Sequence, residues 1–143
     1  MKKSLTITFW ALVGFFLFIL SEFFIPVIRN LFKGSELFLL PFIIFSFLGV
    51  VLIFLTLKKR IKGVLRKFLL LTGASAVGFF IFVFLHNAFY ALSIITGHIV
   101  LLNYLTEVLH VAFFLIAIFV CPLGFLIGMV GVMVIAIKKR NRF

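Results

Sequence analysis

Residues 37–67 read LFLLPFIIFSFLGVVLIFLTLKKRIKGVLRK, and this stretch decides the class of fold. Its first part, 37–57, carries no charged residue and is long enough to cross the hydrocarbon core of a bilayer as one helix. The segment that follows, 58–67, holds six of the fourteen Lys and Arg residues in the chain. An apolar run that stops at a basic cluster is typical of a membrane span ending at a headgroup layer.

The same alternation extends in both directions along the chain. Four apolar runs, at about 5–28, 37–57, 68–95 and 104–137, are separated by short polar segments. The chain is 66% hydrophobic and 12% charged, whereas soluble domains are about 45–50% apolar and about 25% charged. The sequence therefore predicts an all-α membrane protein. We expect a single transmembrane domain over 1–143, folded as a compact bundle of four transmembrane helices with a basic connector at 58–67.

The fourth run is too long for an upright span. As one helix it would measure ~51 Å at 1.5 Å per residue, against ~30 Å for the hydrocarbon core. We expect either that this helix tilts and protrudes or that Pro122 breaks it. Pro26, near the end of the first run, predicts a kink there.

The distribution of basic residues predicts the orientation. The N-terminal segment holds two Lys, the second connector six Lys and Arg, and the C-terminal segment four, whereas the first connector holds two and the third none. Because Lys and Arg beside spans are retained on the cytoplasmic side, we expect both termini in the cytoplasm. Basic residues on that side are expected to contact anionic lipid headgroups. They are Lys58, Lys59, Arg60, Lys62, Arg66, Lys67, Lys138, Lys139 and Arg140.

The net charge of +11 does not indicate a nucleic-acid partner, because the charges flank spans instead of forming a groove. Cys121 is the only cysteine and the chain contains no Asp, so the sequence offers no disulfide, CxxC pair or Ser-His-Asp triad. It also lacks phosphate-binding glycine loops and HExxH motifs. We expect no catalytic residues, no cofactor and no resident metal.

Small residues in the fourth run predict a helix-packing face. In lipid, helices associate through close backbone approach at small residues and through interhelical hydrogen bonds. Gly124 and Gly128 have GxxxG spacing, and other small residues share their helical stripe. This face is expected to join the third and fourth spans or to join two copies of the chain. It consists of Ala117, Cys121, Gly124, Gly128 and Gly131.

Strongly polar residues within the spans gather at the outer end. Counted at 1.5 Å per residue from the cytoplasmic charges, Glu22 and His86 lie ~28 Å deep, close to the outer boundary of a ~30 Å core. Ionisable residues within a span are costly and rare, so each is a functional candidate. The candidate outer polar cluster is Glu22, His86, Asn87, Tyr90, Glu107 and His110.

Four interpretations of this cluster are open. Its carboxylates and imidazoles match the mixed oxygen and nitrogen ligands of a single metal site. They could also relay protons or small cations, or the helix ends could enclose a small extracytoplasmic pocket. The plainest interpretation, which we favour, is that interfacial polar residues bond across helices and to water and fix the outer end of the bundle. The 23 Phe residues are interpreted as lipid-facing and gap-filling bulk.

Three stretches, KFLLLTGASA at 67–76, FLHNAFY at 84–90 and VCPLGF at 120–125, resemble those of small four-span membrane proteins of bacteria and archaea. The resemblance covers most of the chain. It implies the four-span architecture and the cytoplasmic membrane of a prokaryote, and it implies no particular activity.

The short connectors and the glycine face favour a non-enzymatic function. We expect an accessory or structural subunit of a membrane assembly, which packs with itself or with a larger membrane-protein partner. The alternative is a small-solute or ion transporter or channel component that uses the outer polar cluster.

Overall fold

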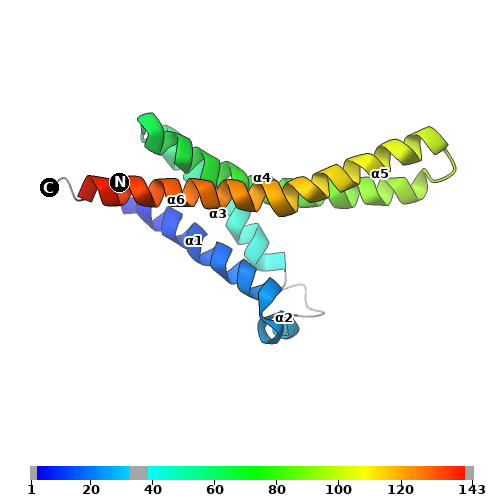
Figure 1. Ribbon diagram of the computed structural model, residues 1–143, viewed down its shortest axis with the longest axis horizontal. Helices are drawn as coiled ribbons and strands as arrows, with labels where there is room; N and C mark the ends of the chain where they lie inside the picture. Colours follow the sequence, from blue (N-terminus) through cyan, green and yellow to red (C-terminus); the bar gives the residue numbers. More distant parts are fainter. Residues whose placement is uncertain (1–2, 33–38, 141–143) are drawn as a thin grey trace.

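The computed structural model describes residues 3–32 and 39–140, and within these ranges the regular structure is helical (Figure 1). Four of the described helices are long and apolar enough to cross a membrane, which confirms the prediction of an all-helical chain with four such helices. The predicted start of the second span, residue 37, lies outside the described residues, as does the side chain of Arg140. The elements are α1 (Lys3–Phe24), α2 (Pro26–Phe32), α3 (Leu40–Lys58), α4 (Gly63–Ile95), α5 (Val100–Leu115), η2 (Ile116–Val120) and α6 (Cys121–Arg140).

The first apolar run forms two helices. α1 ends at Phe24, and the Ile25 N–H still donates to the Ser21 carbonyl at 2.9 Å. α2 then begins at Pro26, where a proline does little harm because the first N–H groups of a helix lack intrahelical partners. The kink predicted near Pro26 is thus a break between α1 and α2.

α3 ends in a tight cap within the basic connector. Arg60 has a φ of 49°, its N–H donates to the Leu57 carbonyl at 3.0 Å, and the Ile61 N–H donates to the Thr56 carbonyl at 3.3 Å. A left-handed residue with these two bonds is a Schellman motif. Because α4 already begins at Gly63, the connector is shorter than expected and its last basic residues lie on the first turns of α4.

Pro122 does not break the fourth span. The Cys121 N–H donates to the Ile116 carbonyl, five residues back, and the turn Ile116–Val120 is π-helical. Proline lacks an N–H and its ring crowds the carbonyl four residues back, and the wider turn just before it lets the helix continue. α5, η2 and α6 therefore form one helix, Val100–Lys139, of 40 residues, or ~60 Å at 1.5 Å per residue.

α4 is the central helix of the fold. It packs against α3, α5 and α6, whereas α1 packs mainly on α3. A Cβ added to Gly49 of α3 would lie 2.9 Å from the Gly73 carbonyl oxygen of α4, and one added to Gly128 of α6 would lie 2.8 Å from the backbone nitrogen of Thr72 on α4. Side-chain carbons do not approach backbone atoms so closely, so these two contacts require glycine.

The predicted packing face of the fourth span lies within the chain, against α4. An added Cβ at Gly124 would meet the Ser75 hydroxyl, and one at Gly131 would meet the ring of Phe68. Ala117 and Cys121, further along the same stripe, are buried. This face therefore joins the third and fourth spans of one chain. It is not available for the alternative that we predicted, a contact between two copies of the chain.

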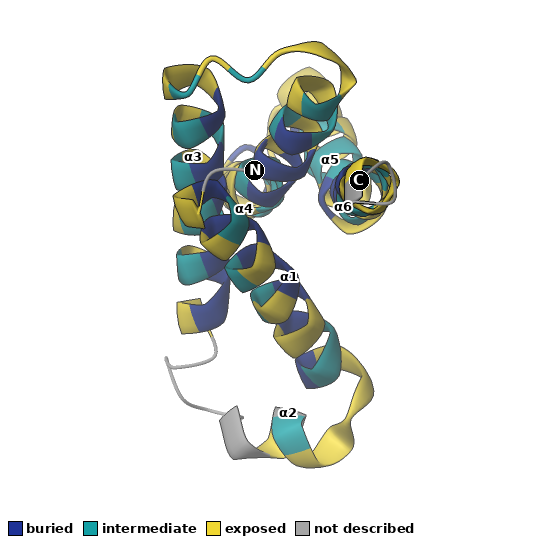
Figure 2. Cartoon of the chain, turned by 90° about the vertical axis from the view of Figure 1, so that its left-hand side faces the viewer, coloured by how far each residue is buried: buried dark blue, intermediate teal, exposed yellow. Residues whose placement is uncertain are grey.

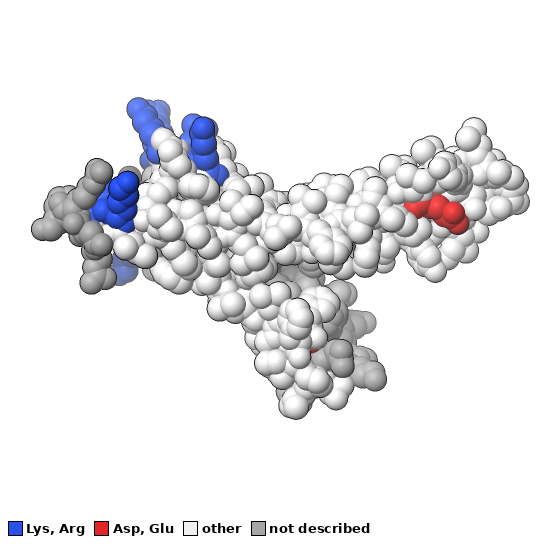
Figure 3. All heavy atoms as spheres, in the orientation of Figure 1, with Lys and Arg blue, Asp and Glu red and all other residues white. Residues whose placement is uncertain are grey.

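One end of the molecule is basic. The start of α1 and the end of α6 lie at this end (Figure 1), and Lys59 Nζ of the connector donates a hydrogen bond to the Ser4 hydroxyl of α1. Figure 3 shows Lys and Arg side chains gathered here and acidic side chains away from it. We call it the basic end and the opposite one the far end.

Towards the far end the helices separate into two arms (Figures 1 and 2). The short arm consists of α2 and the far halves of α1 and α3, and the long arm consists of the far half of α4 together with α5. α3 has 19 residues and α4 has 33, which correspond to ~28 Å and ~50 Å. The expectation of a compact bundle fails at the far end, because the close glycine contacts lie between the middle of the molecule and the basic end.

Candidate functional site

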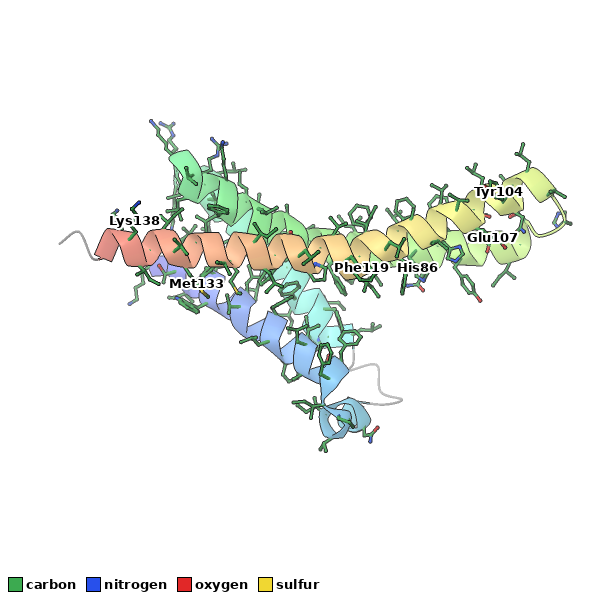
Figure 4. The ribbon with its side chains drawn as sticks, in the orientation of Figure 1. His86, Tyr104, Glu107, Phe119, Met133 and Lys138 are labelled. Atoms are coloured by element: carbon green, nitrogen blue, oxygen red, sulfur yellow. The ribbon has the colours of Figure 1, made fainter. Side chains whose placement is uncertain are left out.

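Three members of the predicted outer cluster meet within the long arm, where Figure 4 shows His86. His86 and Tyr90 lie on α4 and His110 lies on α5. His86 Nδ1 is 2.9 Å from the His110 carbonyl oxygen, and since a carbonyl oxygen only accepts, Nδ1 carries the hydrogen and donates it. The two imidazole centroids are 5.4 Å apart, and the Tyr90 ring packs edge-on against His110 at 5.6 Å. The group ties the two helices of the long arm together.

Asn87 and Glu107 lie beside this group and make no bond to it. Asn87 is exposed, and its Nδ2 donates to the Val83 carbonyl of its own helix at 2.9 Å. Glu107 is also exposed and lies nearer than His86 to the turn between α4 and α5 (Figure 4).

Glu22 lies in the other arm. It continues the buried stripe of α1 that includes Phe16 and Ile19, and it is only 1% exposed. Neither of its carboxylate oxygens has a hydrogen-bond partner among the described residues. A common depth in the membrane suggested that Glu22 joins the histidines, but α1 diverges from α4 and α5 (Figure 1). The six predicted residues are thus divided between two arms.

This division bears on the chemistry of the cluster. Over residues 3–32 and 39–140, no three His, Cys, Asp or Glu side chains lie close enough to hold one metal ion. His110 Nδ1 is buried and has no hydrogen-bond partner in this part of the chain. The cluster makes one hydrogen bond and two ring contacts between α4 and α5. These contacts hold the two helices together.

A crevice of about 650 Å³ lies between the two arms. Its wall comes from α1, α3, α4 and the helix formed by α5, η2 and α6. Among the described residues of that wall, only Ser75, His86 and Cys121 carry polar side-chain atoms, and the rest are aromatic or aliphatic. The volume lies within the range of small-molecule sites, about 300–1,000 Å³.

Three Phe rings close the crevice towards the basic end. Phe16 of α1 stacks on Phe125 of α6 with ring centroids 4.5 Å apart, and Phe45 of α3 lies 5.2 Å from Phe125 and 6.2 Å from Phe16. On its own helix, each is the wall residue nearest the basic end. The rings form a floor, which bridges the short arm to α6.

Sequence reasoning missed this crevice. From the sequence, the Phe residues are interpreted as lipid-facing and gap-filling bulk; Phe47 and Phe54 are exposed, whereas Phe16 and Phe125 are buried and also line the crevice. Helical spacing places Phe16 and Phe23 on one side of α1, which is a usable signal for a face. No residue pattern identifies the helix opposite that face or its distance.

The basic end holds a second, smaller pocket of about 240 Å³. Three of the predicted headgroup residues, Arg60, Lys62 and Arg66, line it together with Thr56. Guanidinium and ammonium groups around one pocket suit a phosphate group. Lys58 lies over the Phe54 ring at 5.4 Å, and Lys67, Lys138 and Lys139 are exposed.

Comparisons with known proteins found no match among protein-family models, curated proteins or solved structures.

Proposed function

We propose that this chain is a four-span protein of the cytoplasmic membrane of a prokaryote, akin to the small four-span proteins of bacteria and archaea that its sequence resembles. Its termini and basic end face the cytoplasm, and Arg60, Lys62 and Arg66 contact anionic headgroups there. It serves as an accessory or structural subunit of a membrane assembly. The length and surface of the long arm carry this proposal.

α4, whose far half belongs to the long arm, is longer than the hydrocarbon core that α1 and α3 match. α1 and α3, with 22 and 19 residues, measure ~33 Å and ~28 Å and match a ~30 Å core. α4, with 33 residues, exceeds that core by ~20 Å. With the basic end held at one headgroup layer, the outer part of the long arm extends beyond the other.

This outer part carries an apolar surface. Val100 and Leu101 at the tip are 84% and 80% exposed, and Tyr104 is 68% exposed. Glu107 is the only charged residue between positions 84 and 115. Contiguous exposed apolar surface marks a site of protein or membrane interaction, and burying it stabilises an assembly by about 25 cal/mol per Å². We therefore infer that a membrane-protein partner covers the outer part of the long arm.

The test is the composition of the native assembly. The tagged full chain is isolated from its own membrane in a mild detergent, and the intact complex is weighed and identified by mass spectrometry. We expect a stoichiometric larger partner, and we expect Leu101→Lys to release that partner while the chain remains helical and monodisperse. His98→Lys, which adds the same charge at an already polar position in the turn just before α5, is the matched control. A lone monomer, or a complex indifferent to Leu101→Lys, would contradict the proposal.

The second candidate is a transporter or channel component for a small solute or ion. It is favoured by Glu22, a buried carboxylate without a described partner, and by the paired imidazoles of His86 and His110. It ranks second because positions 3–16, 44–57, 68–78 and 120–137 contain no His, Asp or Glu to continue a path to the basic end. It requires that Glu22→Gln or His86→Ala abolish flux in vesicles without lowering the folded yield; unchanged flux would remove it.

A further inference from the structure

We propose that the crevice between the two arms holds an acyl chain of one bilayer lipid, drawn from the leaflet at the far end. The inference depends on the four helices crossing a bilayer and is independent of any protein partner. Its floor is the ring cluster of Phe16, Phe45 and Phe125, and His86 is the wall residue of α4 that lies farthest from this floor. We take the level of His86 as the mouth of the crevice.

The depth of the crevice corresponds to one leaflet. Its wall runs along α4 from Ser75 to His86 and along the opposite helix from Phe114 to Phe125, and each of these stretches measures ~16 Å. Half of a ~30 Å hydrocarbon core is ~15 Å. A chain that enters at the headgroup level therefore reaches the floor with its terminal carbons.

The crevice also lies at the correct level. Phe16 is ~20 Å along α1 from Lys3, and Phe125 is ~20 Å along α6 from Lys138. Both basic residues mark the headgroup layer at the basic end, so the floor stands slightly beyond the middle of the bilayer. From the floor, the crevice runs through the remaining ~10 Å of the far leaflet's hydrocarbon and reaches ~6 Å into its headgroup layer.

The chemistry of the wall selects an alkyl chain. An apolar space left empty forfeits the dispersion contacts of every atom that lines it, and water in it would find few of the polar partners that buried water needs. The acyl chain is the apolar molecule that the bilayer supplies at this level. Among the described wall residues, His86 alone can hydrogen-bond through a ring nitrogen, and it lies at the level where the ester and headgroup of such a lipid would lie.

The experiment maps photochemical contacts along the chain. The full protein is reconstituted in vesicles of phosphatidylglycerol and phosphatidylethanolamine that contain a trace of phospholipid with a diazirine either at the end of one acyl chain or near its ester. After illumination, labelled peptides are identified by mass spectrometry. We expect the terminal diazirine to label Phe16 and Phe125 and the ester-proximal one to label the region of Phe114. Phe54, exposed on the outside of α3, reports contact with bulk lipid.

A matched pair of variants separates a bound chain from bulk contact. Val83→Phe fills the crevice from its α4 wall, whereas Ile81→Phe adds the same ring at an exposed position of the same helix that does not line the crevice. Val83→Phe should lower floor labelling relative to Phe54 by about tenfold, the factor that corresponds to ~1.4 kcal/mol of binding. Ile81→Phe should leave the ratio unchanged. Ile118→Phe fills the crevice from the opposite wall and serves if Val83→Phe does not fold.

Three outcomes would overturn the proposal. The floor could remain unlabelled, which would mean that another part of the protein or a second copy occupies the crevice. The terminal and ester-proximal probes could label the same residues, which would exclude a chain inserted end-first. Floor labelling could also be indifferent to both filling variants, which would mean that the lipid contact is non-specific.

Discussion

At Gly128, one added methyl group has no space to occupy. A Cβ there would lie 2.8 Å from the Thr72 nitrogen and 3.0 Å from the Phe68 carbonyl oxygen, whereas one at Gly124 would meet mainly the Ser75 hydroxyl, which can rotate away. We expect Gly128→Ala to lower the free energy of unfolding by about 1–3 kcal/mol, the usual cost of overpacking, and Gly124→Ala to lower it by less. The measurement is thermal unfolding of each variant in one detergent.

Gly14 provides the control for this comparison. It lies in the interior of α1 with nothing within 4 Å of an added Cβ, so Gly14→Ala should be neutral or should stabilise the helix by up to about 1 kcal/mol. Equal unfolding midpoints for Gly14→Ala and Gly128→Ala would show that α4 and α6 do not approach as closely as described.

Glu22 carries a buried carboxyl group with no hydrogen-bond partner among the described residues. Burying a carboxylate without a partner costs several kcal/mol, and a neutral amide of the same shape costs less. Glu22→Gln should therefore raise the free energy of unfolding by an amount on the order of 1 kcal/mol, and with it the unfolding midpoint. Glu107→Gln, at an exposed position of the long arm, should leave the midpoint unchanged. A lower midpoint for Glu22→Gln would mean that the carboxylate has an ion-pair or ligand partner.

At the scale of an element, the π-helical turn before Pro122 is a local solution to a missing donor. Pro122→Ala restores an N–H that can bond the carbonyl four residues back, so the turn should revert to α-helix and the unfolding free energy should rise by on the order of 1 kcal/mol. Hydrogen exchange of residues 116–122 and thermal unfolding together provide the measurement. Pro41→Ala, in the first turn of α3 where no donor is needed, should gain nothing. A destabilised Pro122→Ala would show that contacts across the crevice require the π-helical turn.

The helices themselves were accessible from the sequence, because long uncharged apolar runs leave no other structure in lipid. The course of the fourth span past Pro122 could not be predicted from the sequence. A proline determines which backbone hydrogen bond is lost, but it does not determine how the neighbouring turns rearrange. The divergence of the arms was also not predictable. It depends on where Gly49 and Gly128 allow close approach to α4 and on the absence of such contacts nearer the far end.

Only part of the candidate site could be predicted from the sequence, for a related reason. Counting residues from the basic end gives the depth of a side chain, and it placed both His86 and His110 towards the outer end, where the two residues are in contact. Depth does not tell which helix lies beside which, so it also grouped Glu22 with them although α1 belongs to the other arm. The crevice between the arms has no sequence signature, because Phe faces lipid and cavity alike.

At the scale of the whole molecule, orientation and protrusion can be tested by accessibility. In a Cys121→Ala background, a cysteine at Gly97 in the turn between α4 and α5 should react with a membrane-impermeant maleimide added to intact cells, and one at Lys62 should react only after permeabilisation. The opposite pattern would reverse the proposed orientation.

The same reagent measures how far the long arm extends. In the isolated chain reconstituted in a bilayer, a cysteine at Leu105 should react, whereas one at Val50, exposed in the middle of α3, should be protected by lipid. Protection at Leu105 would mean that the long arm lies tilted within the membrane and does not project from it.

The central position of α4 also has a consequence for biogenesis. Membrane helices insert individually and then associate, and synthesis delivers them in order from the N-terminus. Until the third span is inserted, α1 and α3 can pack only against each other. The surface at Gly49, which contacts α4 in the folded protein, then faces lipid. A chain truncated before α4 would thus leave a loosely packed hairpin in the bilayer, which quality-control proteases would degrade. Stable folding therefore begins only when the third span has been inserted.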